Sequence, residues 1–362
     1  MTRLPATLVL ADGLELAGWA AGYLPPSGVT TGEFVFNTAL SGYQEIITDP
    51  SYFGQIITFT YPHLGNYGVT PADDESRQSW CSGVVARALT EKPSGWRAQR
   101  SLEDYLIERR IAAIVGVDTR RLTRHLREHG ALAGAFGHAE PGTVAAAARA
   151  ARGTDGRDFV REVSTREPYG EGQEGPHVVA LDYGIKRSMV RQLAQRFRVT
   201  VLPADTSAGD VLARKPDAVF LSNGPGDPAA LDFQVAQIQA WLGRVPVMGI
   251  CLGHQLLARA LGASTFKLPF GHHGSNHPVR DLTTGRIEIT AQNHNYAVDE
   301  SALRAAVVTH RNANDGVVEG LADASQRCFS VQYHPEAAPG PHDARYLFER
   351  FAGLVASGRM DR

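Results

Sequence analysis

The chain contains few cysteines, little net charge and no long hydrophobic run. Three cysteines in 362 residues, with no two close together, argue against a disulfide framework and against a zinc site. A formal net charge of −2 gives no reason to expect nucleic acid or an anionic membrane as a partner. No apolar run approaches the length of a membrane span. The composition therefore favours a protein that works without nucleic acid, membrane or structural metal.

Two further signals are missing. The first residues lack the apolar core of a signal peptide, because Asp12 and Gly13 interrupt it, so a cytoplasmic location is expected. No Gly-x-x-x-x-Gly-Lys-Ser/Thr loop occurs, and we expect no ATP site in this chain. The stretch Gly224-Pro-Gly-Asp-Pro-Ala229 formally fits a dinucleotide loop, but its prolines remove donors that a pyrophosphate would need. It is better interpreted as a tight loop whose backbone approaches a small substrate.

Length and composition predict two globular domains. Hydrophobic residues make up 43% and charged residues 20% of the chain, as in ordinary globular proteins. A chain of 362 residues is long enough for about two domains. Only one stretch, 166–177, has the Gly, Pro and Glu content of a linker. We therefore predict one domain over 1–165, a linker over 166–176 and a second domain over 177–362.

The N-terminal half reads as a mixed α+β domain. Asp12-Gly13 between two apolar runs predicts a hairpin, and further strands are expected at 33–36, 55–60, 83–86 and 111–115. Helices are predicted after Ser101 and over 119–129, the second capped by Asp118 and ended by Gly130. No catalytic constellation occurs in this half, so we interpret it as a docking domain.

The predicted helix over 119–129 is rich in arginine. Arg120, Arg121, Arg124 and Arg127 form either a solvated basic face, which is what charge runs usually are, or a contact face for a larger partner. The sequence leaves both interpretations open.

The C-terminal half alternates strands and helices. Strands are expected at 177–181, 198–202, 218–222 and 245–250, each followed by a helical pattern. That order predicts a doubly wound, mostly parallel sheet covered on both faces. Functional groups in such sheets gather at the carboxyl ends of the strands, where Asn223, Cys251 and His334 would lie.

The clearest chemical signal is Val245-Pro-Val-Met-Gly-Ile-Cys-Leu-Gly-His-Gln255. An apolar run leads into Cys251, and a helical pattern follows it. Glycines two residues before and two after the cysteine permit a strained strand-to-helix turn without a side-chain clash. A thiol there stands at the positive end of a helix, which favours a nucleophilic thiolate. Cys81 and Cys328 lack such flanks and are predicted to be buried small hydrophobes.

A base for the thiol is predicted in Cys328-Phe-Ser-Val-Gln-Tyr-His-Pro-Glu336. The apolar run ends in His334 and Glu336, and two residues of spacing place both side chains on one side of a strand. The imidazole can take the thiol proton while the carboxylate orients it. For the oxyanion, the N–H of Leu252 and that of Gly224 are the expected donors.

These motifs resemble those of the class I glutamine amidotransferases and, among them, the small subunits of carbamoyl-phosphate synthase. In the C-terminal half the resemblance is carried by Gly-Ile-Cys-Leu-Gly-His-Gln, His-Pro-Glu, Leu221-Ser-Asn-Gly-Pro-Gly-Asp-Pro228, Phe270-Gly-His-His-Gly-Ser-Asn-His-Pro278, Gln292-Asn-His-Asn-Tyr-Ala-Val298 and Pro339-Gly-Pro-His342. In the N-terminal half it is carried by Gly32-Glu-Phe-Val-Phe-Asn-Thr38, Gly42-Tyr-Gln-Glu-Ile-Ile-Thr-Asp-Pro-Ser-Tyr52 and Asp118-Thr-Arg-Arg-Leu-Thr-Arg124.

The resemblance implies a glutaminase with a Cys251-His334-Glu336 triad that supplies ammonia to a large partner subunit, in a heterodimer or a higher assembly. The partner would hold ATP and Mg²⁺ and make carbamoyl phosphate from bicarbonate for pyrimidines and arginine, so no cofactor is expected in this chain. Contacts with L-glutamine are implied for Ser51, Gly224, Gly226, Leu252, Gln255, Asn293, Asn295 and Tyr296. The sequence leaves two alternatives open: a stand-alone triad amidotransferase or γ-glutamyl hydrolase, and a non-catalytic interaction subunit.

Two local features of the C-terminal half concern its histidines and Asn295. His272, His273 and His277 lie among Gly271, Gly274 and Pro278, so a structural loop is expected there rather than a metal site. Relatives usually carry Gly where this chain has Asn295. Because Asn is the side chain that best tolerates the left-handed region, positive φ is predicted at Asn295, with its backbone on the substrate.

Overall fold

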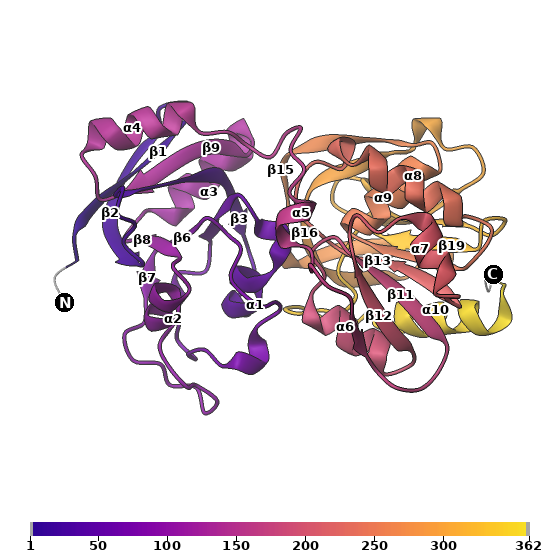
Figure 1. Cartoon of the computed structure of the whole chain (residues 1–362). Coiled ribbons are helices and arrows are strands. Elements are labelled where there is room, and N and C mark those ends of the chain that lie inside the picture. The colour runs from indigo at the N-terminus through magenta and orange to yellow at the C-terminus, as the bar shows by residue number, and fades with distance from the viewer. Residues whose placement is uncertain (1–2, 360–362) are drawn as a thin grey trace. The chain divides into compact units, whose positions relative to one another are not determined.

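The computed structural model describes residues 3–359, which fold as two compact units (Figure 1). Unit 1 comprises Met1–Asp155 and Pro269–His273, and unit 2 comprises Gly156–Leu268 and Gly274–Arg362. Pro269–His273 is tied to unit 1 by backbone bonds: Ala131 N donates to Pro269 O at 2.7 Å and Thr38 N to His273 O at 3.1 Å. Each unit is described by itself below.

The boundary lies earlier than the sequence predicted. Residues 156–165 belong to unit 2, because α5 (Val160–Val163) buries Val160 in the core of that unit. The supposed linker over 166–176 contains β10 (Tyr169–Glu171), which pairs antiparallel with β12 (Arg198–Pro203). The Gly- and Pro-rich composition had indicated a linker, but these residues form an edge strand of the sheet.

Unit 1 is built on a closed barrel with the strand order β1-β2-β8-β6-β4-β3-β9. Its strands are β1 (Pro5–Leu10), β2 (Glu15–Gly22), β3 (Val29–Asn37), β4 (Gln55–Phe59), β6 (Gly83–Ala86), β8 (Ala112–Val115) and β9 (Leu132–Gly137), and β5 (His63–Leu64) pairs with β7 (Ala88–Leu89) outside it. The predicted hairpin around Asp12-Gly13 is confirmed by the antiparallel pairing of β1 with β2. Closing the barrel leaves the sheet without exposed edges.

The helices of unit 1 are α1 (Tyr43–Thr48), α2 (Leu102–Glu108), α3 (Thr119–His129) and α4 (Pro141–Ala150), with 3₁₀ turns η1 (Pro50–Tyr52) and η2 (Pro71–Asp73). The caps are as predicted: Ser101 accepts from the N–H of Asp104, and Asp118 from that of Arg121. Helix α3 buries Leu122 and Leu126 and exposes its four arginines. That exposure fits both a solvated face and a contact face.

Unit 2 is organised around a ten-stranded sheet with the order β10-β12-β11-β13-β14-β19-β18-β17-β15-β16. Its strands, beyond β10 and β12, are β11 (His177–Asp182), β13 (Ala218–Leu221), β14 (Val247–Ile250), β15 (Ser264–Asp281), β16 (Ile287–Asp299), β17 (Val307–Asn312), β18 (Val318–Asp323) and β19 (Cys328–Val331). The segment from β12 to β19 is parallel, as predicted.

Helices cover both faces of the parallel strands. On one face α6 (Arg187–Ala194) and α10 (Tyr346–Ser357) pack on residues such as Val178 and Met248. On the other, α7 (Ala208–Ala213), α8 (Asp232–Trp241) and α9 (Leu252–Ala260) pack on residues such as Val179 and Val247. Successive side chains of a strand point to opposite faces, so two cores form. The 3₁₀ turns η3 (Pro228–Ala230) and η4 (Glu300–Ala302) complete the unit.

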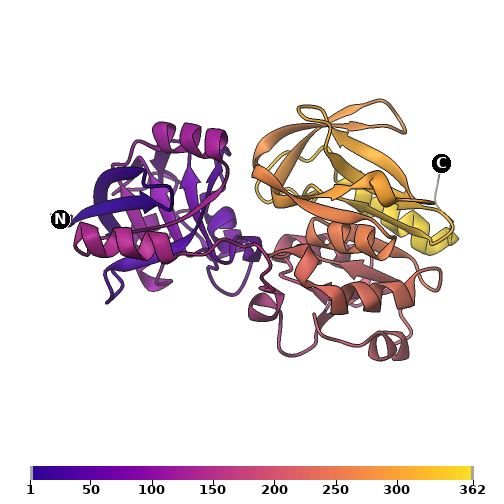
Figure 2. The same ribbon diagram turned by 90° about the horizontal axis from the view of Figure 1, so that it is seen from above.

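The antiparallel extension β15–β18 was not foreseen (Figure 2). The residues around His272–Pro278 had been predicted to form a loop, and they lie inside the 18-residue strand β15. Gly271 has φ 69, so the strand deviates locally from extended backbone there instead of ending. A strand that tolerates glycine and proline in this way does not show the alternation by which strands are recognised.

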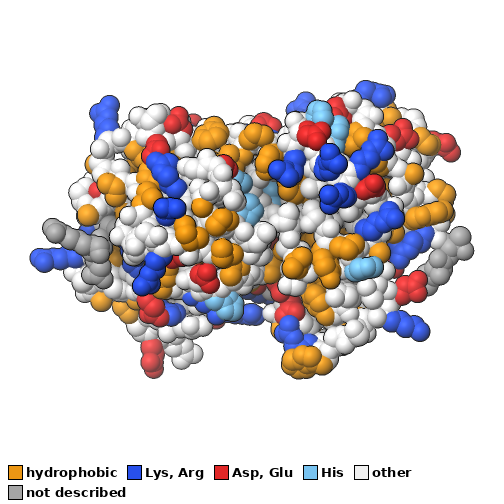
Figure 3. Space-filling view, turned by 180° about the vertical axis from the view of Figure 1, so that it is seen from behind, with side chains coloured by type: hydrophobic (Ala, Val, Ile, Leu, Met, Phe, Trp, Pro, Cys, Tyr) orange, Lys and Arg blue, Asp and Glu red, His pale blue; other side chains and the backbone are white. Residues whose placement is uncertain are grey.

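The surface drawn in Figure 3 mixes Lys and Arg with Asp and Glu, with hydrophobic side chains scattered among them. A surface of this kind gives no large field of one sign. Among residues 3–359 no helix is both long and apolar enough to span a membrane.

Candidate active site

Cys251 stands between β14 and α9 with φ 55 and ψ −108. Positive φ is uncommon and costly for a residue with a side chain, and it recurs at functional sites. The turn is held on both sides: Cys251 N donates to Val331 O at 2.9 Å, and Gln255 N donates to Cys251 O at 3.1 Å. The predicted strained turn is confirmed.

The two flanking glycines are required by close packing of the backbone. A Cβ on Gly249 would lie 2.6 Å from Gly253 O, and a Cβ on Gly253 would lie 2.2 Å from Leu221 O. Neither glycine has positive φ, so the lack of a side chain, rather than conformational freedom, explains both positions. The helix α9 can therefore begin directly against the end of β13.

His334 and Glu336 form the predicted pair, although not on a strand. Nδ1 of His334 lies 2.8 Å from Oε1 of Glu336. β19 ends at Val331, so both residues belong to the turn after it, and Ala337 with φ 55 continues that turn. Cys251, His334 and Glu336 are 2%, 3% and 1% exposed. The contact thus depends on a buried turn and not on strand alternation.

Lys186, which the sequence reasoning missed, binds the same carboxylate oxygen of Glu336 as His334 does. Its Nζ donates to Glu336 Oε1 at 2.7 Å and to Ala338 O at 2.6 Å. Burial raises the pKa of Glu336, but the charges of Lys186 and His334 outweigh it and lower the pKa to about 2. The only sequence signal was that this lysine follows β11 closely, at the carboxyl end of the parallel strands, where functional groups gather.

The electrostatics favour a protonated His334. Burial lowers the pKa of His334, but the negative charge of Glu336 and the neighbouring Cys251 raise it to about 10. Nδ1 is bonded to Glu336, and Nε2 has no hydrogen-bond partner of normal geometry within residues 3–359. Nε2 is therefore the atom available to exchange a proton with the thiol of Cys251, and Glu336 stabilises the imidazolium.

Two backbone donors are unused beside the thiol. Within residues 3–359, neither the N–H of Leu252 nor that of Gly224 has a hydrogen-bond partner. Leu252 opens α9, where the first N–H groups of a helix lack internal partners. Gly224 and Gly226 lie in the loop after β13, and Gly226 has φ 96. A free N–H in each of the two predicted places is what an oxyanion site requires.

The substrate side of the site in unit 2 is formed by α9 and β16. Cys251 Sγ lies 3.5 Å from Asn293 O, and Gln255 Nε2 donates to Tyr296 O at 2.8 Å. The structure thus places Asn293 against the thiol and Gln255 against Tyr296. Their contacts with glutamine stay predictions.

The expectation of positive φ at Asn295 is wrong. Asn295 lies inside β16, and it is not among the residues with positive φ. The strand continues through this position, so the residue is extended, and its tolerance of the left-handed region plays no part here.

Ser51 belongs to unit 1. It lies in η1, 8% exposed, and its N–H donates to Asp49 Oδ1 at 2.9 Å. The Asp49-Pro50-Ser51 turn is therefore ordered by a side-chain cap. Its contact with glutamine stays a prediction.

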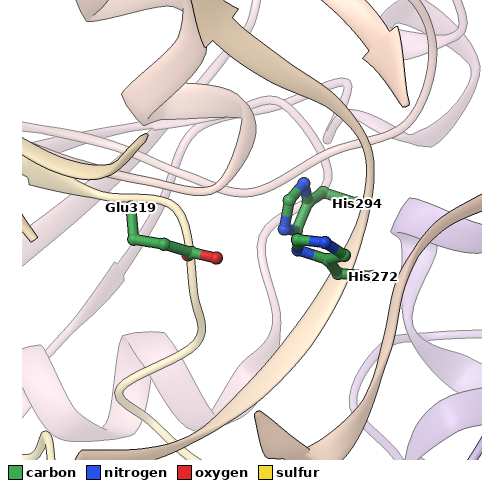
Figure 4. A group of neighbouring side chains, drawn as sticks. All are labelled: His272, His294 and Glu319. Carbon is green, nitrogen blue, oxygen red and sulfur yellow. The ribbon is translucent and has the colours of Figure 1, made fainter. Parts of the chain in front are cut away.

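Some histidine and glutamate side chains of the chain are of types that can bind a metal ion, but they already make hydrogen bonds within the protein. Figure 4 labels His272, which belongs to unit 1, and His294 and Glu319, which belong to unit 2; all three are residue types that can bind a metal ion. The ring nitrogens of His294 already lie 2.8 Å from Tyr296 O and 2.8 Å from Gln292 Oε1. Glu319 Oε1 accepts from Asn312 at 2.9 Å. Both ring nitrogens of His294 therefore already take part in hydrogen bonds.

Cys81 and Cys328 are buried, as predicted. Burial raises the pKa of each thiol to about 12, so both remain protonated at neutral pH.

Comparison with known proteins covers both units. Residues 179–354 match the family "Glutamine amidotransferase class-I", and residues 8–136 match "Carbamoyl-phosphate synthase small chain, CPSase domain". Among similar curated proteins are carbamoyl phosphate synthase small chains of Syntrophotalea carbinolica (49% identity, 99% of this chain and 100% of the relative), Symbiobacterium thermophilum (51%, 96% and 97%) and Xylella fastidiosa (50%, 97% and 98%).

Proposed function

Because the chain belongs to the family of carbamoyl-phosphate synthase small chains, we propose that it hydrolyses L-glutamine and delivers the ammonia to a large subunit. The observation that carries this proposal is the thiol of Cys251, held at positive φ beside the buried His334–Glu336 pair. A cysteine that serves only as packing needs neither a strained backbone nor a paired imidazole.

The reaction follows from these contacts. Cys251 gives its proton to His334 Nε2, and the thiolate attacks the side-chain amide carbon of glutamine. The carbonyl oxygen becomes negative and is stabilised by the N–H groups of Leu252 and Gly224. The tetrahedral adduct collapses with loss of ammonia, which takes the proton from His334, and a γ-glutamyl thioester remains. Water, deprotonated by His334, hydrolyses the thioester to glutamate and restores the thiol.

Lys186 and Glu336 act on this reaction through His334. The Lys186 ammonium keeps Glu336 ionised, and Glu336 holds Nδ1–H of the imidazole so that Nε2 faces the thiol. The carboxylate also stabilises the imidazolium that forms when the thiol is deprotonated.

The second half of the reaction would then take place in a large partner subunit. We propose that this partner, with bound ATP and Mg²⁺, combines ammonia with bicarbonate to form carbamoyl phosphate for pyrimidine and arginine synthesis. Unit 1, which carries the small-chain match at residues 8–136, is then the docking unit. The isolated chain should show no ATP binding in calorimetry at micromolar concentrations. The cytoplasmic location expected from the sequence stays a prediction.

The decisive test separates the two nitrogen sources. In the complex with the large subunit, Cys251→Ser is expected to abolish carbamoyl phosphate synthesis from glutamine and to leave synthesis from ammonium salts intact, because only the nucleophile is lost. An equal loss with both nitrogen sources, in a complex shown to be assembled, would contradict the proposed division of labour. A stand-alone glutaminase would instead turn over glutamine equally fast with and without the partner.

A further inference from the structure

The donor loop after β13 begins with a serine whose hydroxyl is fully used. Ser222 is 0% exposed. Its Oγ donates to Asn223 O at 2.8 Å and accepts from Tyr183 N at 2.9 Å. The backbone oxygen of the same residue accepts from Gly253 N at 2.9 Å. One residue therefore joins the end of β11, the donor loop and the first turn of α9.

The bond to Asn223 O determines where the next N–H points. In a trans peptide the C=O and the N–H lie in one plane and point in opposite directions. Once the Asn223 carbonyl is held toward Ser222 Oγ, the N–H of Gly224 is directed to the other side of the loop. That N–H has no partner within residues 3–359, so it is available to a ligand.

Gly224 makes this restraint necessary. A Cβ at this position would lie 2.1 Å from Tyr183 O, so only glycine fits. Glycine is also the residue whose flanking peptides rotate most easily, because no side chain restricts φ. A donor carried by a glycine needs an external bond to keep its direction.

We propose that Ser222 is a positioning residue for the acyl transfer: its hydroxyl holds the Asn223–Gly224 peptide so that the Gly224 N–H faces the developing oxyanion. The inference rests on the proposed function, because it takes that oxyanion to be the one formed by Cys251 on glutamine. It adds that the Gly224 and Leu252 donors share one support, since Ser222 O binds Gly253 N at the start of α9.

The competing explanation is that Ser222 only satisfies buried polar groups. A matched control exists on the same sheet: Ser330 of β19 is also 0% exposed, and its Oγ lies 2.8 Å from His254 Nδ1. Ser330→Ala removes a buried serine bond of similar length but does not touch the donor loop. Ser222→Cys keeps the side-chain volume and weakens the hydrogen bond.

The experiment compares Ser222→Ala, Ser222→Cys and Ser330→Ala in the complex with the large subunit. We measure kcat and KM for glutamine hydrolysis, thermal unfolding, and inhibition by two ligands. One ligand is the aldehyde analogue of glutamine, to which the thiol adds; the C–S bond forms, the thiol proton moves to oxygen, and that oxygen occupies the oxyanion position. The other is glutamate, which forms no such adduct.

Loss of an oxyanion donor lowers kcat by about 10²–10³-fold, so a misdirected donor in Ser222→Ala should lower kcat by about 10- to 100-fold with KM changed less than about threefold. The inhibition constant of the aldehyde should rise by a similar factor, and that of glutamate should not. Ser222→Cys should lie between wild type and Ser222→Ala. Ser330→Ala should lower the unfolding temperature without changing the ratio of the two inhibition constants.

Equal inhibition ratios in Ser222→Ala and Ser330→Ala, with both proteins folded, would overturn the inference. If neither Ser222 variant folds, Asn223→Gly replaces them, because it loosens the same peptide. An altered ratio of the two inhibition constants in Asn223→Gly, with a wild-type ratio in Ser330→Ala, then supports the inference. An unaltered ratio in Asn223→Gly overturns it. Failure of the proposed function looks different: Cys251→Ser would then retain glutamine-dependent synthesis.

Discussion

Cys251 and Cys328 lie at opposite ends of two paired strands, β14 and β19, and both are buried, at 2% and 0% exposed, yet their surroundings are chemically opposite. Cys328 begins β19 in extended backbone and pairs in register with Val247 of β14. Cys251 follows the other end of β14, at positive φ. Burial therefore does not distinguish a reactive thiol from an inert one in this chain. The distinction depends on which end of the strand carries the cysteine.

The carboxyl end offers two further features that the amino end lacks. At this end the N–H of Leu252 has no hydrogen-bond partner within residues 3–359. The turn that carries His334 follows β19 at the same end of the sheet. Cys328, by contrast, lies near Asp323, whose negative charge adds to burial in raising the pKa of that thiol to about 12. The comparison predicts that each cysteine can be removed with a distinct consequence.

The largest effect is expected from replacing the two cysteines separately. Cys251→Ala should lower the kcat of glutamine hydrolysis by at least about 10⁴-fold, as for other deleted nucleophiles, with little change in the free energy of unfolding. Cys328→Ala should leave kcat within about twofold and lower the free energy of unfolding by about 1–2 kcal/mol, because it opens space in the core. Hydrolysis assays and urea unfolding on both variants check this. An activity loss in Cys328→Ala would remove the contrast.

The second effect concerns the buried charged groups at the carboxyl end of the strands, which are Lys186, Glu336 and His334. Glu336→Gln removes the negative charge that faces the buried Lys186 ammonium, so the free energy of unfolding should fall by about 3–5 kcal/mol. Glu336 has its pKa lowered from 4.5 to about 2, so its contribution is present above pH 4.5 and is lost as pH falls. His334 has its pKa raised from 6.5 to about 10, so its contribution is present below pH 6.5 and is lost as pH rises.

The difference in stability between wild type and Glu336→Gln should therefore be largest between pH 4.5 and 6.5 and should shrink on both sides. Urea unfolding of both proteins across a pH series measures it. A difference that keeps growing above pH 7 would have the wrong sign for a protonated His334.

A smaller effect is expected from the glycine that shapes the turn. A Cβ at Gly253 would meet Leu221 O at 2.2 Å, so Gly253→Ala should displace the start of α9, cost about 1–3 kcal/mol and lower kcat by about 10²-fold. Gly142 in α4 is the control, because nothing lies within 4 Å of its added Cβ and its φ is not positive. Gly142→Ala should leave kcat unchanged. Equal kinetics for the two variants would show that the turn does not set the reactivity of Cys251.

The smallest effect concerns β16, the strand that faces the thiol. Because Asn295 is extended, Asn295→Gly should remove a side chain from a strand and cost about 0.5–1 kcal/mol. Asn295→Ala serves as the control for loss of the amide alone. Chemical unfolding of the pair measures the backbone contribution, and a gain of stability in Asn295→Gly would indicate a strained backbone after all.

Some of these residues could be predicted from the sequence, and others could not. Cys251, its two glycines and the His334–Glu336 pair were predictable, because each is a local pattern with a specific physical requirement. Lys186 was not, because it lies 150 residues from Glu336 and only the fold brings them together. The φ of Asn295 was predicted from residue preference, and the long strand β16 overrode that preference. The strand β15 was mistaken for a loop because its glycines and prolines are typical of turns.

The most direct test of the central claim is to identify the cysteine that carries the γ-glutamyl group. The complex is supplied with isotopically labelled glutamine and quenched in acid during turnover, and the labelled peptide is identified by mass spectrometry. The label is expected on the peptide containing Cys251 and absent from those containing Cys81 and Cys328. It should disappear in Cys251→Ser and persist in Cys328→Ala. A thioester on Cys328, or glutamine hydrolysis that continues in Cys251→Ser, would contradict the account.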